Sequence, residues 1–429
     1  MKPIIQVALD FVDLDRALKV AQEAVRAGAD WLEAGTPLIK SCGLEAVRIL
    51  KKQFPKNLIV ADMKVLDAGR IEVEIAAKSG ADIVVVMANA SDSTIKESIE
   101  AARNYGAKIL VDFMGEFCDI ERVRKLISLE PDFLGFHIPI DQQMTGNISF
   151  EFLKEISKIS NIPVAIAGGL NSENVVDAVK AGASILIIGG AITKSENAEK
   201  AVRLIRKAID THTSIKSEFF KRYKEENIGE VFLKVSTANL SDAMHRGGWI
   251  PNVKPFGVKS KFFGQAITVR TYPGDWAKPV EAVDIAKQGD VIVIDACGQP
   301  PAVWGELATQ SAVIKKLAGV VIYGAIRDVE EIRRLEFPAF ATLCCPQAGE
   351  PKGLGEINVP IQIGKIKILP GDWIVGDDDG VVCIPHQKAA EIANRAMDVL
   401  EKENRIRSEI REGGTLSEIT HLLRWEKPR

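Results

Sequence analysis

Two apolar segments in the first part of the sequence end on aspartates. The stretch VALDFVDLD carries Asp10, and the stretch IVADMKVLDAG carries Asp62, with Lys64 and Asp67 shortly after it. A charge that directly follows a buried strand is costly unless a ligand, a metal ion or an opposite charge uses it. These four side chains are therefore candidates for one binding or catalytic site.

Other apolar segments of the first half also end on a polar residue. The further examples are Glu33, Asp112 and His137. A single acid at such a position can be a satisfied core residue or a helix cap. Six charged or titratable groups are much harder to explain in that way if the fold brings them to one edge.

Two glycine pairs follow the last apolar segments of this half. They are Gly168 with Gly169 in AIAGGLNSENV, and Gly189 with Gly190 in IIGGAITKSENA. Each pair is followed by polar residues that open a helical stretch. Glycine lets the backbone approach an anion closely, and a helix N-terminus offers free N–H groups. The two pairs together predict a phosphate-binding site.

The elements that must position these residues alternate regularly. Apolar β-branched segments and amphipathic helical stretches succeed one another eight times in about 210 residues, as in a small (β/α)8 barrel, known as a TIM barrel. A doubly wound open sheet is the alternative, but eight units favour closure. In a barrel, the C-terminal strand ends form the active-site face, and phosphate commonly binds after strands seven and eight. The polar residues and both glycine pairs then share one rim.

The second half of the sequence has a different organisation. A charged helical stretch over residues 211–230 separates the barrel (1–210) from a second domain (231–429). In the second domain, glycine and proline turns separate short strands, and helices are expected at 306–318 and 387–411. This pattern predicts a mixed α/β sandwich, so the whole chain falls in the α/β class.

Two motifs of the second domain combine residues that could bind an anion or a cation. AVWGELATQSA places three residues at a strand-to-helix junction, namely Gly305, Glu306 and Leu307. GAIRDVEE ends an apolar segment on Arg327 and Asp328, with Glu331 three residues later. Arginine can bind a carboxylate through two hydrogen bonds, and aspartate can ligate a divalent ion. An internal salt bridge between Arg327 and Asp328 is the alternative.

Composition limits the classes of partner. The 429 residues carry a formal net charge of −3, which argues against a dedicated nucleic-acid-binding protein. No run of 18 apolar residues is present, and the N-terminal apolar stretch is too short for a signal peptide. Six scattered cysteines without CxxC spacing are typical of reduced thiols. We expect a cytoplasmic protein that binds neither nucleic acid nor membrane.

The first half resembles the 3-hexulose-6-phosphate synthases. The matching segments are LEAGTPLIKSCGLEAVRILKKQFP, VADMKVLDAG, GADIVVVMA, VAIAGGLN and IIGGAITK. These synthases belong to the orotidine-phosphate decarboxylase suprafamily, whose Asp-x-Lys-x-x-Asp motif corresponds to Asp62, Lys64 and Asp67. The resemblance covers residues 1 to about 210.

This resemblance implies a reversible aldol reaction that depends on Mg²⁺ or Mn²⁺. D-ribulose 5-phosphate and formaldehyde would give D-arabino-3-hexulose 6-phosphate. Glu33 and Asp62 would hold the metal ion, and Lys64, held between Asp62 and Asp67, would stabilise an enediolate. His137 is the candidate for proton transfer, with a satisfied core histidine as the alternative. Asp10 is expected to orient Lys64 or a substrate hydroxyl.

The resemblance also implies a homo-oligomer. It leaves one related class of enzyme as an alternative for the first half. In the suprafamily, the second aspartate of the motif reaches a neighbouring subunit's site, so Asp67 implies a dimer of barrels. 3-Keto-L-gulonate-6-phosphate decarboxylases share the motif and the metal ligands, and a barrel of that kind joined to a non-catalytic module is the alternative. They typically have an arginine after the eighth-strand glycine, where this chain has GGAITK. Orotidylate decarboxylases lack both the metal requirement and the EAGTPLIK segment.

The second half resembles the ribonuclease-activity-regulator-A family, which includes 4-hydroxy-4-methyl-2-oxoglutarate aldolases. The matching segments within about 230–411 are STANLSDAM, GELATQSA, YGAIRD, GEINVPIQIG and PGDWIVGDDDGVVCIP. Catalytic members carry Arg-Asp-x-x-Glu/Asp, and Glu331 supplies the final acid here. The resemblance implies a metal-dependent lyase that acts on a small 2-oxo acid. A module that regulates ribonuclease, or only mediates oligomerisation, is the alternative. Trimers of this domain and dimers of barrels would together give a hexamer.

Overall fold

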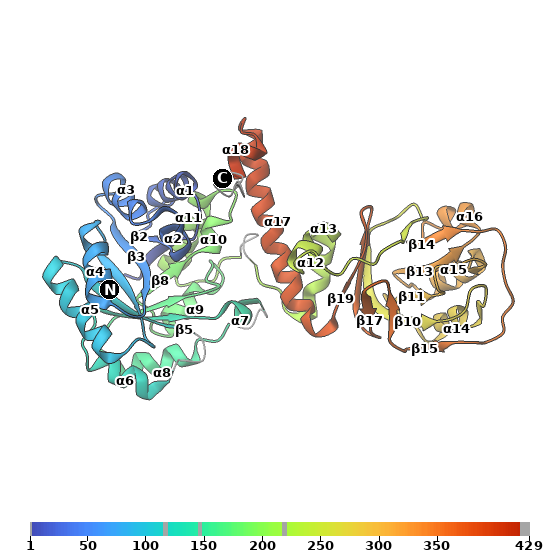
Figure 1. Cartoon of the computed structure of the whole chain (residues 1–429), viewed down its shortest axis with the longest axis horizontal. Helices are drawn as coiled ribbons and strands as arrows, with labels where there is room; N and C mark the ends of the chain where they lie inside the picture. The colour runs from blue at the N-terminus through green and yellow to red at the C-terminus, as the bar shows by residue number, and fades with distance from the viewer. Residues whose placement is uncertain (1, 115–118, 145–147, 217–220, 421–429) are drawn as a thin grey trace, which may run out of the picture. The chain divides into compact units, whose positions relative to one another are not determined.

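The computed structural model describes residues 2–114, 119–144, 148–216 and 221–420 (Figure 1). Cys118, residues 217–220 of the expected linker and residues 421–429 of the expected second domain lie outside these ranges. The chain forms two compact units. The first comprises Met1–Arg222 and Glu401–Arg429, and the second comprises Tyr223–Leu400.

The first unit is built on a closed barrel of eight parallel strands in sequence order. The strands are β1 (Ile4–Leu9), β2 (Trp31–Ala34), β3 (Leu58–Val65), β4 (Ile83–Met87), β5 (Lys108–Met114), β6 (Phe133–His137), β7 (Val164–Ala167) and β8 (Ile185–Ile188). β1 pairs with both β2 and β8, which closes the sheet. The predicted (β/α)8 barrel is thus confirmed, and the open-sheet alternative is excluded.

Helices surround this barrel (Figure 1). They are α1 (Leu14–Arg26), α2 (Thr36–Cys42), α3 (Glu45–Gln53), α4 (Gly69–Lys78), α5 (Asp92–Tyr105), α6 (Ile120–Ile127), α7 (Ile140–Met144), α8 (Glu151–Ile159), α9 (Val175–Lys180), α10 (Gly190–Thr193) and α11 (Ala198–Thr211). Glycines in the left-handed region follow several helices, as at Gly28 (φ 94°) and Gly80 (φ 99°). Glycine adopts this conformation without steric cost, so these residues end the helix and turn the chain toward the next strand.

Burial on both faces of the barrel sheet explains why its strands are almost continuously apolar. In β3, Ile59 and Ala61 pack in the layer between the sheet and the helices. Val60 points to the barrel interior and packs with Trp31, Leu110 and other interior residues. Side chains therefore alternate between two cores, as the two-residue period of a strand requires.

The second unit is built on a mixed sheet in which the strands run in the order β19-β18-β10-β11-β13-β14-β9, with β12 paired to β13 and β15 paired to β10. Its strands are β9 (Lys254–Pro255), β10 (Phe262–Arg270), β11 (Val291–Asp295), β12 (Ala302–Trp304), β13 (Gly319–Ile326), β14 (Ala339–Cys344), β15 (Glu356–Ile357), β18 (Trp373–Asp377) and β19 (Gly380–Ile384). A separate hairpin joins β16 (Ile361–Ile363) to β17 (Ile366–Ile368). The predicted mixed α/β architecture is confirmed.

Helices and the hairpin cover the two faces of this sheet. Ile292 and Ile294 of β11 pack toward α14 (Ala277–Ile285), α15 (Glu306–Ile314) and α16 (Val329–Arg334). Val291 and Val293 pack on the other face, against apolar residues of the hairpin. A further core joins β18 and β19 to three helices, α12 (Ile228–Lys234), α13 (Thr237–Ala243) and α17 (Ala389–Arg411). A last helix, α18 (Leu416–Thr420), follows α17.

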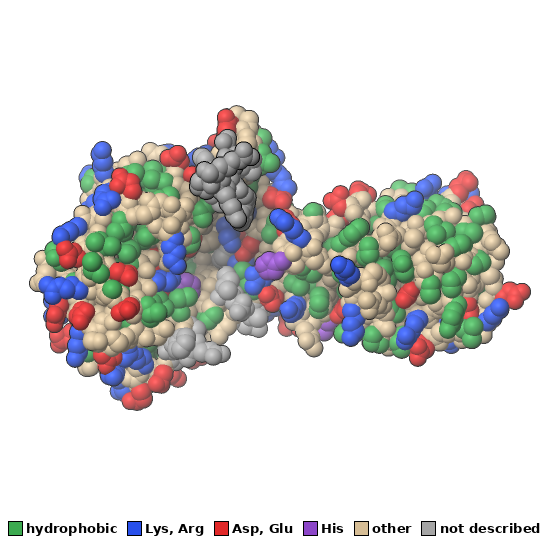
Figure 2. Space-filling view, viewed as in Figure 1, with side chains coloured by type: hydrophobic (Ala, Val, Ile, Leu, Met, Phe, Trp, Pro, Cys, Tyr) green, Lys and Arg blue, Asp and Glu red, His purple; other side chains and the backbone are tan. Residues whose placement is uncertain are grey.

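The charged surface agrees with the small net charge. Lys and Arg side chains are interspersed with Asp and Glu over the face of each unit seen in Figure 2. Among the described helices, none has the length and apolar character that a membrane span requires.

Candidate active site

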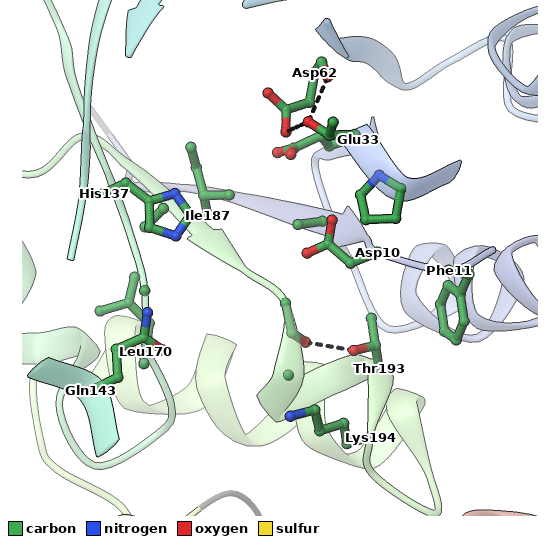
Figure 3. A pocket seen from close by; sticks show the side chains of 18 of the residues that line it. Asp10, Phe11, Glu33, Asp62, His137, Gln143, Leu170, Ile187, Thr193 and Lys194 are labelled. Carbon is green, nitrogen blue, oxygen red and sulfur yellow. Dashed lines mark hydrogen bonds between the residues drawn. The ribbon is translucent and has the colours of Figure 1, made fainter. Parts of the chain in front are cut away.

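A cavity of about 730 Å³ in the first unit is lined by residues at the C-terminal ends of the barrel strands. Ten residues that the sequence placed at strand ends line it, namely Asp10, Glu33, Asp62, Lys64, Asp112, His137, Gly168, Gly169, Gly189 and Gly190. Figure 3 shows several of these side chains converging on the space. Asp67 is not among the lining residues, and it is exposed on the segment before α4.

Lys64 is bound by two buried carboxylates. Its Nζ lies 3.1 Å from Asp62 Oδ1 and 3.3 Å from Asp112 Oδ2. Burial lowers the pKa of Lys64, but the negative charges of Asp62 and Asp112 outweigh it and raise that pKa. The ammonium therefore stays charged at neutral pH. The second carboxylate beside Lys64 is that of Asp112 on β5. The expectation that Lys64 lies between Asp62 and Asp67 of the same chain is therefore wrong.

Lys64 has an unusual backbone. Its φ is 47°, and the pairing of β3 with β4 shifts register between Ala61 and Val65. Non-glycine residues in the left-handed region are strained and are concentrated at functional sites. Strand irregularities of this kind re-aim side chains. The irregular end of β3 thus sets the direction in which Lys64 enters the cavity.

Glu33 lies on β2 beside two other acids. Gln6 Nε2 of β1 donates a hydrogen bond of 2.5 Å to Glu33 Oε2. Burial raises the pKa of Glu33 well above its usual value, and the charges of Asp62 and Asp10 raise it further. Asp10 behaves similarly, since burial and the charge of Asp62 raise its pKa. Asp10, Glu33, Asp62 and Asp112 together form what we call the acidic cluster.

Thr36 and Gly35 position the acidic cluster, and sequence reasoning missed both. Thr36 Oγ1, in the first turn of α2, donates a hydrogen bond of 2.7 Å to Asp62 Oδ2. A Cβ on Gly35 would lie 2.2 Å from Asp10 Oδ1, so only glycine leaves room for the Asp10 carboxylate. Both residues belong to the segment EAGTPLIK, whose Gly-Thr-Pro sequence at a strand-to-helix junction was the available signal.

The acidic cluster fits a magnesium ion that is shared with a substrate. Among the described residues, no group of three or more His, Cys, Asp or Glu forms a complete metal cage. Mg²⁺ often binds through one or two protein carboxylates and keeps other positions for water and substrate oxygens. Glu33 and Asp62 could supply these carboxylates. Their mutual repulsion, which contributes to the raised pKa of Glu33, is what a divalent cation would relieve.

The glycine pairs and basic side chains line another part of the cavity. Gly168 (φ 102°) and Gly169 (φ 68°) adopt left-handed conformations after β7, and a Cβ on Gly168 would lie 2.6 Å from the Ile138 carbonyl oxygen. Gly189 precedes α10, and its carbonyl accepts a 3.2 Å hydrogen bond from Thr193 Oγ1. In the view of Figure 3, Asp10 lies between Glu33 and Lys194. This backbone and Lys194, which sequence reasoning missed, suit a phosphate group.

His137 ends β6 and lines the cavity with a partly exposed side chain. Its positive form lowers the pKa values of Asp10 and Asp112, although burial raises both overall. Figure 3 shows the imidazole directed into the space that the acidic cluster also faces. An imidazole in this place can exchange a proton with a bound molecule.

The candidate residues of the second unit lie where two strands end. Gly305 joins β12 to α15, and Arg327 and Asp328 directly follow β13. Asp328 Oδ2 accepts a 3.2 Å hydrogen bond from the Glu306 N–H and lies 3.4 Å from Arg327 Nε. The ion pair between Arg327 and Asp328, which was the alternative interpretation of these residues, is therefore present. A Cβ on Gly305 would lie 2.5 Å from Asp328 Oδ2, so this glycine makes room for the carboxylate.

Two other predicted residues of this unit have exposed side chains. Glu331, on α16, lies 3.8 Å from Arg334, and its side chain is 47% exposed. Leu307, on α15, is 74% exposed. Asp378 and Asp379 connect β18 to β19, and Asp377 at the end of β18 accepts hydrogen bonds from Thr237.

The closed barrel and the charged cluster at its C-terminal rim define a TIM-barrel protein with an enzyme-like site. Residues 3–205 match the family model described as orotidine 5′-phosphate decarboxylase / HUMPS family, and residues 237–383 match the model described as RraA-like, Aldolase/RraA. The chain therefore belongs to the orotidine 5′-phosphate decarboxylase / HUMPS family through its first half and carries an RraA-like domain in its second half.

Three relatives illustrate the similarity. An uncharacterized protein of Methanocaldococcus jannaschii is 41% identical over 191 residues, which are 44% of this chain and 90% of that protein. The 3-hexulose-6-phosphate synthase of Mycobacterium gastri is 34% identical over 205 residues, or 48% of this chain and 99% of that protein. The bifunctional enzyme Fae/Hps of Methanothrix thermoacetophila is 36% identical over 196 residues, or 46% of this chain and 50% of that protein.

Proposed function

We propose that the first unit is a 3-hexulose-6-phosphate synthase that condenses D-ribulose 5-phosphate with formaldehyde. One observation carries the proposal. A single cavity contains both the acidic cluster with Lys64 and a glycine-rich, basic part suited to a phosphate group. A phosphorylated ketose has its charged phosphate and its reactive carbonyl at opposite ends, as this cavity requires. The similarity to named synthases of this family supports the same substrate class.

The residues allow each step of the condensation. The glycine pairs and Lys194 bind the phosphate, which leaves C1 and the C2 carbonyl near the acidic cluster. His137 removes a proton from C1, and Lys64 stabilises the negative charge that develops on the resulting enediolate. C1 then attacks the formaldehyde carbon, and the new alkoxide oxygen takes up a proton. When bound at Glu33 and Asp62, Mg²⁺ or Mn²⁺ would polarise substrate oxygens.

The eighth-strand end favours this reaction over the related decarboxylation. The residue after Gly190 is Ala191, which is buried and uncharged. The arginine expected there in 3-keto-L-gulonate-6-phosphate decarboxylases is therefore replaced by a residue that cannot contact a second anionic group.

The test is formaldehyde consumption with D-ribulose 5-phosphate, with and without Mg²⁺. We expect the wild type to be active only with the metal ion. Asp62→Ala should reduce activity by roughly 1000-fold or more, since it removes a metal ligand and a partner of Lys64. Asp177→Ala is the matched control, because Asp177 lies in an exposed ion pair with Lys180. Well-folded wild type that consumes no formaldehyde but decarboxylates 3-keto-L-gulonate 6-phosphate would contradict the proposal.

For the second unit we propose a divalent-metal lyase that acts on a small 2-oxo acid. The arrangement of Arg327 and Asp328 supports it, because a guanidinium can bind a carboxylate and an aspartate can ligate a divalent ion. Oxaloacetate decarboxylation by the full chain with Mg²⁺ tests this function, and Asp328→Ala should abolish it. Tight binding of a ribonuclease without lyase activity would favour the regulatory alternative.

We further propose that the barrels dimerise through the surface around Asp67. Leu66 precedes Asp67, and Ile71 and Ile75 follow it one turn apart on one face of α4. All three apolar side chains are exposed in the single chain. A dimer would cover them and bring Asp67 toward the neighbouring barrel. With trimeric second units the assembly would be a hexamer, and a monomeric mass by light scattering would overturn this interpretation.

A further inference from the structure

The end of the chain packs against the barrel of the first unit. We call residues 401–420, which comprise the end of α17 and α18, the tail segment. The Arg405 side chain is 5% exposed and is the main anchor. Its Nη1 donates a hydrogen bond of 2.8 Å to the Ser195 carbonyl oxygen. Its Nη2 lies 3.5 Å from Glu23 Oε1 on α1. A buried guanidinium with these partners holds a single position, because leaving its charge unpaired would be costly.

Two further ion pairs extend this anchor along α1. Arg16 lies 3.6 Å from Glu409, and Lys19 lies 3.1 Å from Glu412. Exposed pairs such as the second contribute little free energy. The three α1 residues that the tail segment pairs with, Arg16, Lys19 and Glu23, are spaced three and four positions apart and so lie on one face of α1.

The anchor acts on the loop that carries Lys194. Ser195, whose carbonyl oxygen accepts from Arg405, is the next residue after Lys194. Glu23, the other partner of Arg405, also accepts a 3.1 Å hydrogen bond from the Ala198 N–H at the start of α11. Arg405 and Glu23 thus fix both sides of the segment between α10 and α11. This segment follows α10, the short helix that begins with Gly190 of the glycine pair that we assign to phosphate binding.

Lys402 precedes Arg405 by three residues and lies on the same side of α17. It lines the cavity together with Arg405, Lys194 and the Gly189 and Gly190 pair. Within the described part of the chain, Lys402 forms no ion pair, whereas Arg405 is fully occupied by the anchor. An ammonium group at a cavity that already offers glycine N–H groups and a second lysine is suited to an anion with two negative charges.

We propose that Lys402 of the tail segment is a phosphate-binding residue of the barrel's active site, and that Arg405 is the positioning residue that holds it there. This inference rests on the proposed function for the identity of the phosphorylated substrate. It assigns the phosphate site to two distant parts of the chain, the eighth barrel strand and the last long helix.

The test measures phosphate binding separately from catalysis, using the full chain. Inorganic phosphate is titrated by ³¹P NMR, and KM and kcat are measured with D-ribulose 5-phosphate and formaldehyde. Lys402→Gln should weaken phosphate binding and raise KM by about 3- to 10-fold, the range of one partly exposed charged contact, with kcat within about twofold. Lys402→Arg should restore most of the affinity. Arg407→Gln is the matched control, because Arg407 is exposed on the same helix and pairs with Glu403.

The outcomes separate this inference from the proposed function. Unchanged phosphate binding in Lys402→Gln, while Lys194→Gln weakens it, would overturn the role of Lys402. Phosphate binding that depends on Lys402 in a protein that consumes no formaldehyde would support that role and contradict the synthase assignment. For Arg405→Ala, a rise in KM without a fall in kcat supports positioning. Wild-type KM and phosphate affinity in a folded Arg405→Ala protein would overturn it.

Discussion

The two units present similar charged groups in different surroundings. Each places acidic and basic side chains at or just after the C-terminal ends of parallel strands, and each uses a glycine to make room for an aspartate. In the barrel, the Asp62 and Asp112 side chains are 9% and 7% exposed, whereas those of Arg327 and Asp328 are 41% and 39% exposed. Charges interact more strongly where water is excluded. The comparison shows that the acidic cluster is shielded from water within the first unit, whereas Arg327 and Asp328 remain open to solvent in the second.

The largest expected effect is that a substitution in one unit abolishes the activity of that unit and leaves the activity of the other unchanged. Lys64→Ala should reduce formaldehyde consumption by roughly 1000-fold or more, because it removes the charge that stabilises the enediolate. Oxaloacetate decarboxylation by the same variant should remain at the wild-type level. Arg327→Ala should show the reverse pattern. Loss of both activities in either folded variant would show that the two sites are coupled, contrary to the comparison.

A smaller effect tests the two glycines that accommodate aspartates. Gly35→Ala should reduce formaldehyde consumption by about 10- to 100-fold, because Asp10 is displaced in a crowded cavity. Gly305→Ala should reduce oxaloacetate decarboxylation less, since the half-exposed Asp328 can rotate into solvent. Steady-state kinetics on both variants, with circular dichroism as the control for folding, measures the difference. Equal losses would show that exposure does not distinguish the sites.

The smallest effect concerns stability and its dependence on pH. Burial and neighbouring acids raise the pKa values of Asp10 and Glu33, and burial raises that of Asp112. The native state therefore binds more protons than the unfolded chain between the ordinary and the raised pKa values. In that window stability falls as pH rises, and without a cation it stays lower above the window than below it.

Calorimetry of Glu33→Gln checks this consequence. The variant should be more stable at neutral pH by about 1 to 2 kcal/mol, or roughly 2 to 8 °C in the Tm of the first unit. Mg²⁺ should raise that Tm in the wild type and less in the variant. Glu331→Gln is the control in the second unit, because Glu331 is half-exposed. A lower Tm in Glu33→Gln would show that the carboxylate stabilises the barrel.

The positions of most candidate residues could be predicted because they follow from chain periodicity. A parallel barrel brings every strand end to one rim, so the residues at or after the C-terminal ends of β1, β2, β3, β5, β6, β7 and β8 had to meet. The partner of Lys64 could not be identified in this way, because Asp112 is separated from Lys64 by 48 positions. The motif spacing favoured Asp67 instead, but the chain turns outward after β3 and leaves Asp67 exposed.

Two other features could not be predicted from sequence patterns, for a different reason. They are the residues that position the acidic cluster and the packing of the tail segment. Gln6 lies in the middle of an apolar strand, and Thr36 resembles any polar residue at the start of a helix. Their roles depend on the side chain opposite them, which the sequence alone does not reveal. The packing of Arg405 against Ser195 joins residues 210 positions apart, and no motif marks either of them.

The discontinuous first unit has a consequence for how the protein is synthesised. Its early part, Met1–Arg222, leaves the ribosome before the whole of the second unit, and Glu401–Arg429 follows last. A nascent barrel can thus close its sheet and assemble the acidic cluster while Arg405 and Lys402 are still untranslated. Premature termination anywhere in the second unit would then release a barrel with its acidic cluster but without Lys402 and Arg405, which line the same cavity. Translation past the second unit thereby becomes a condition for a completely lined cavity.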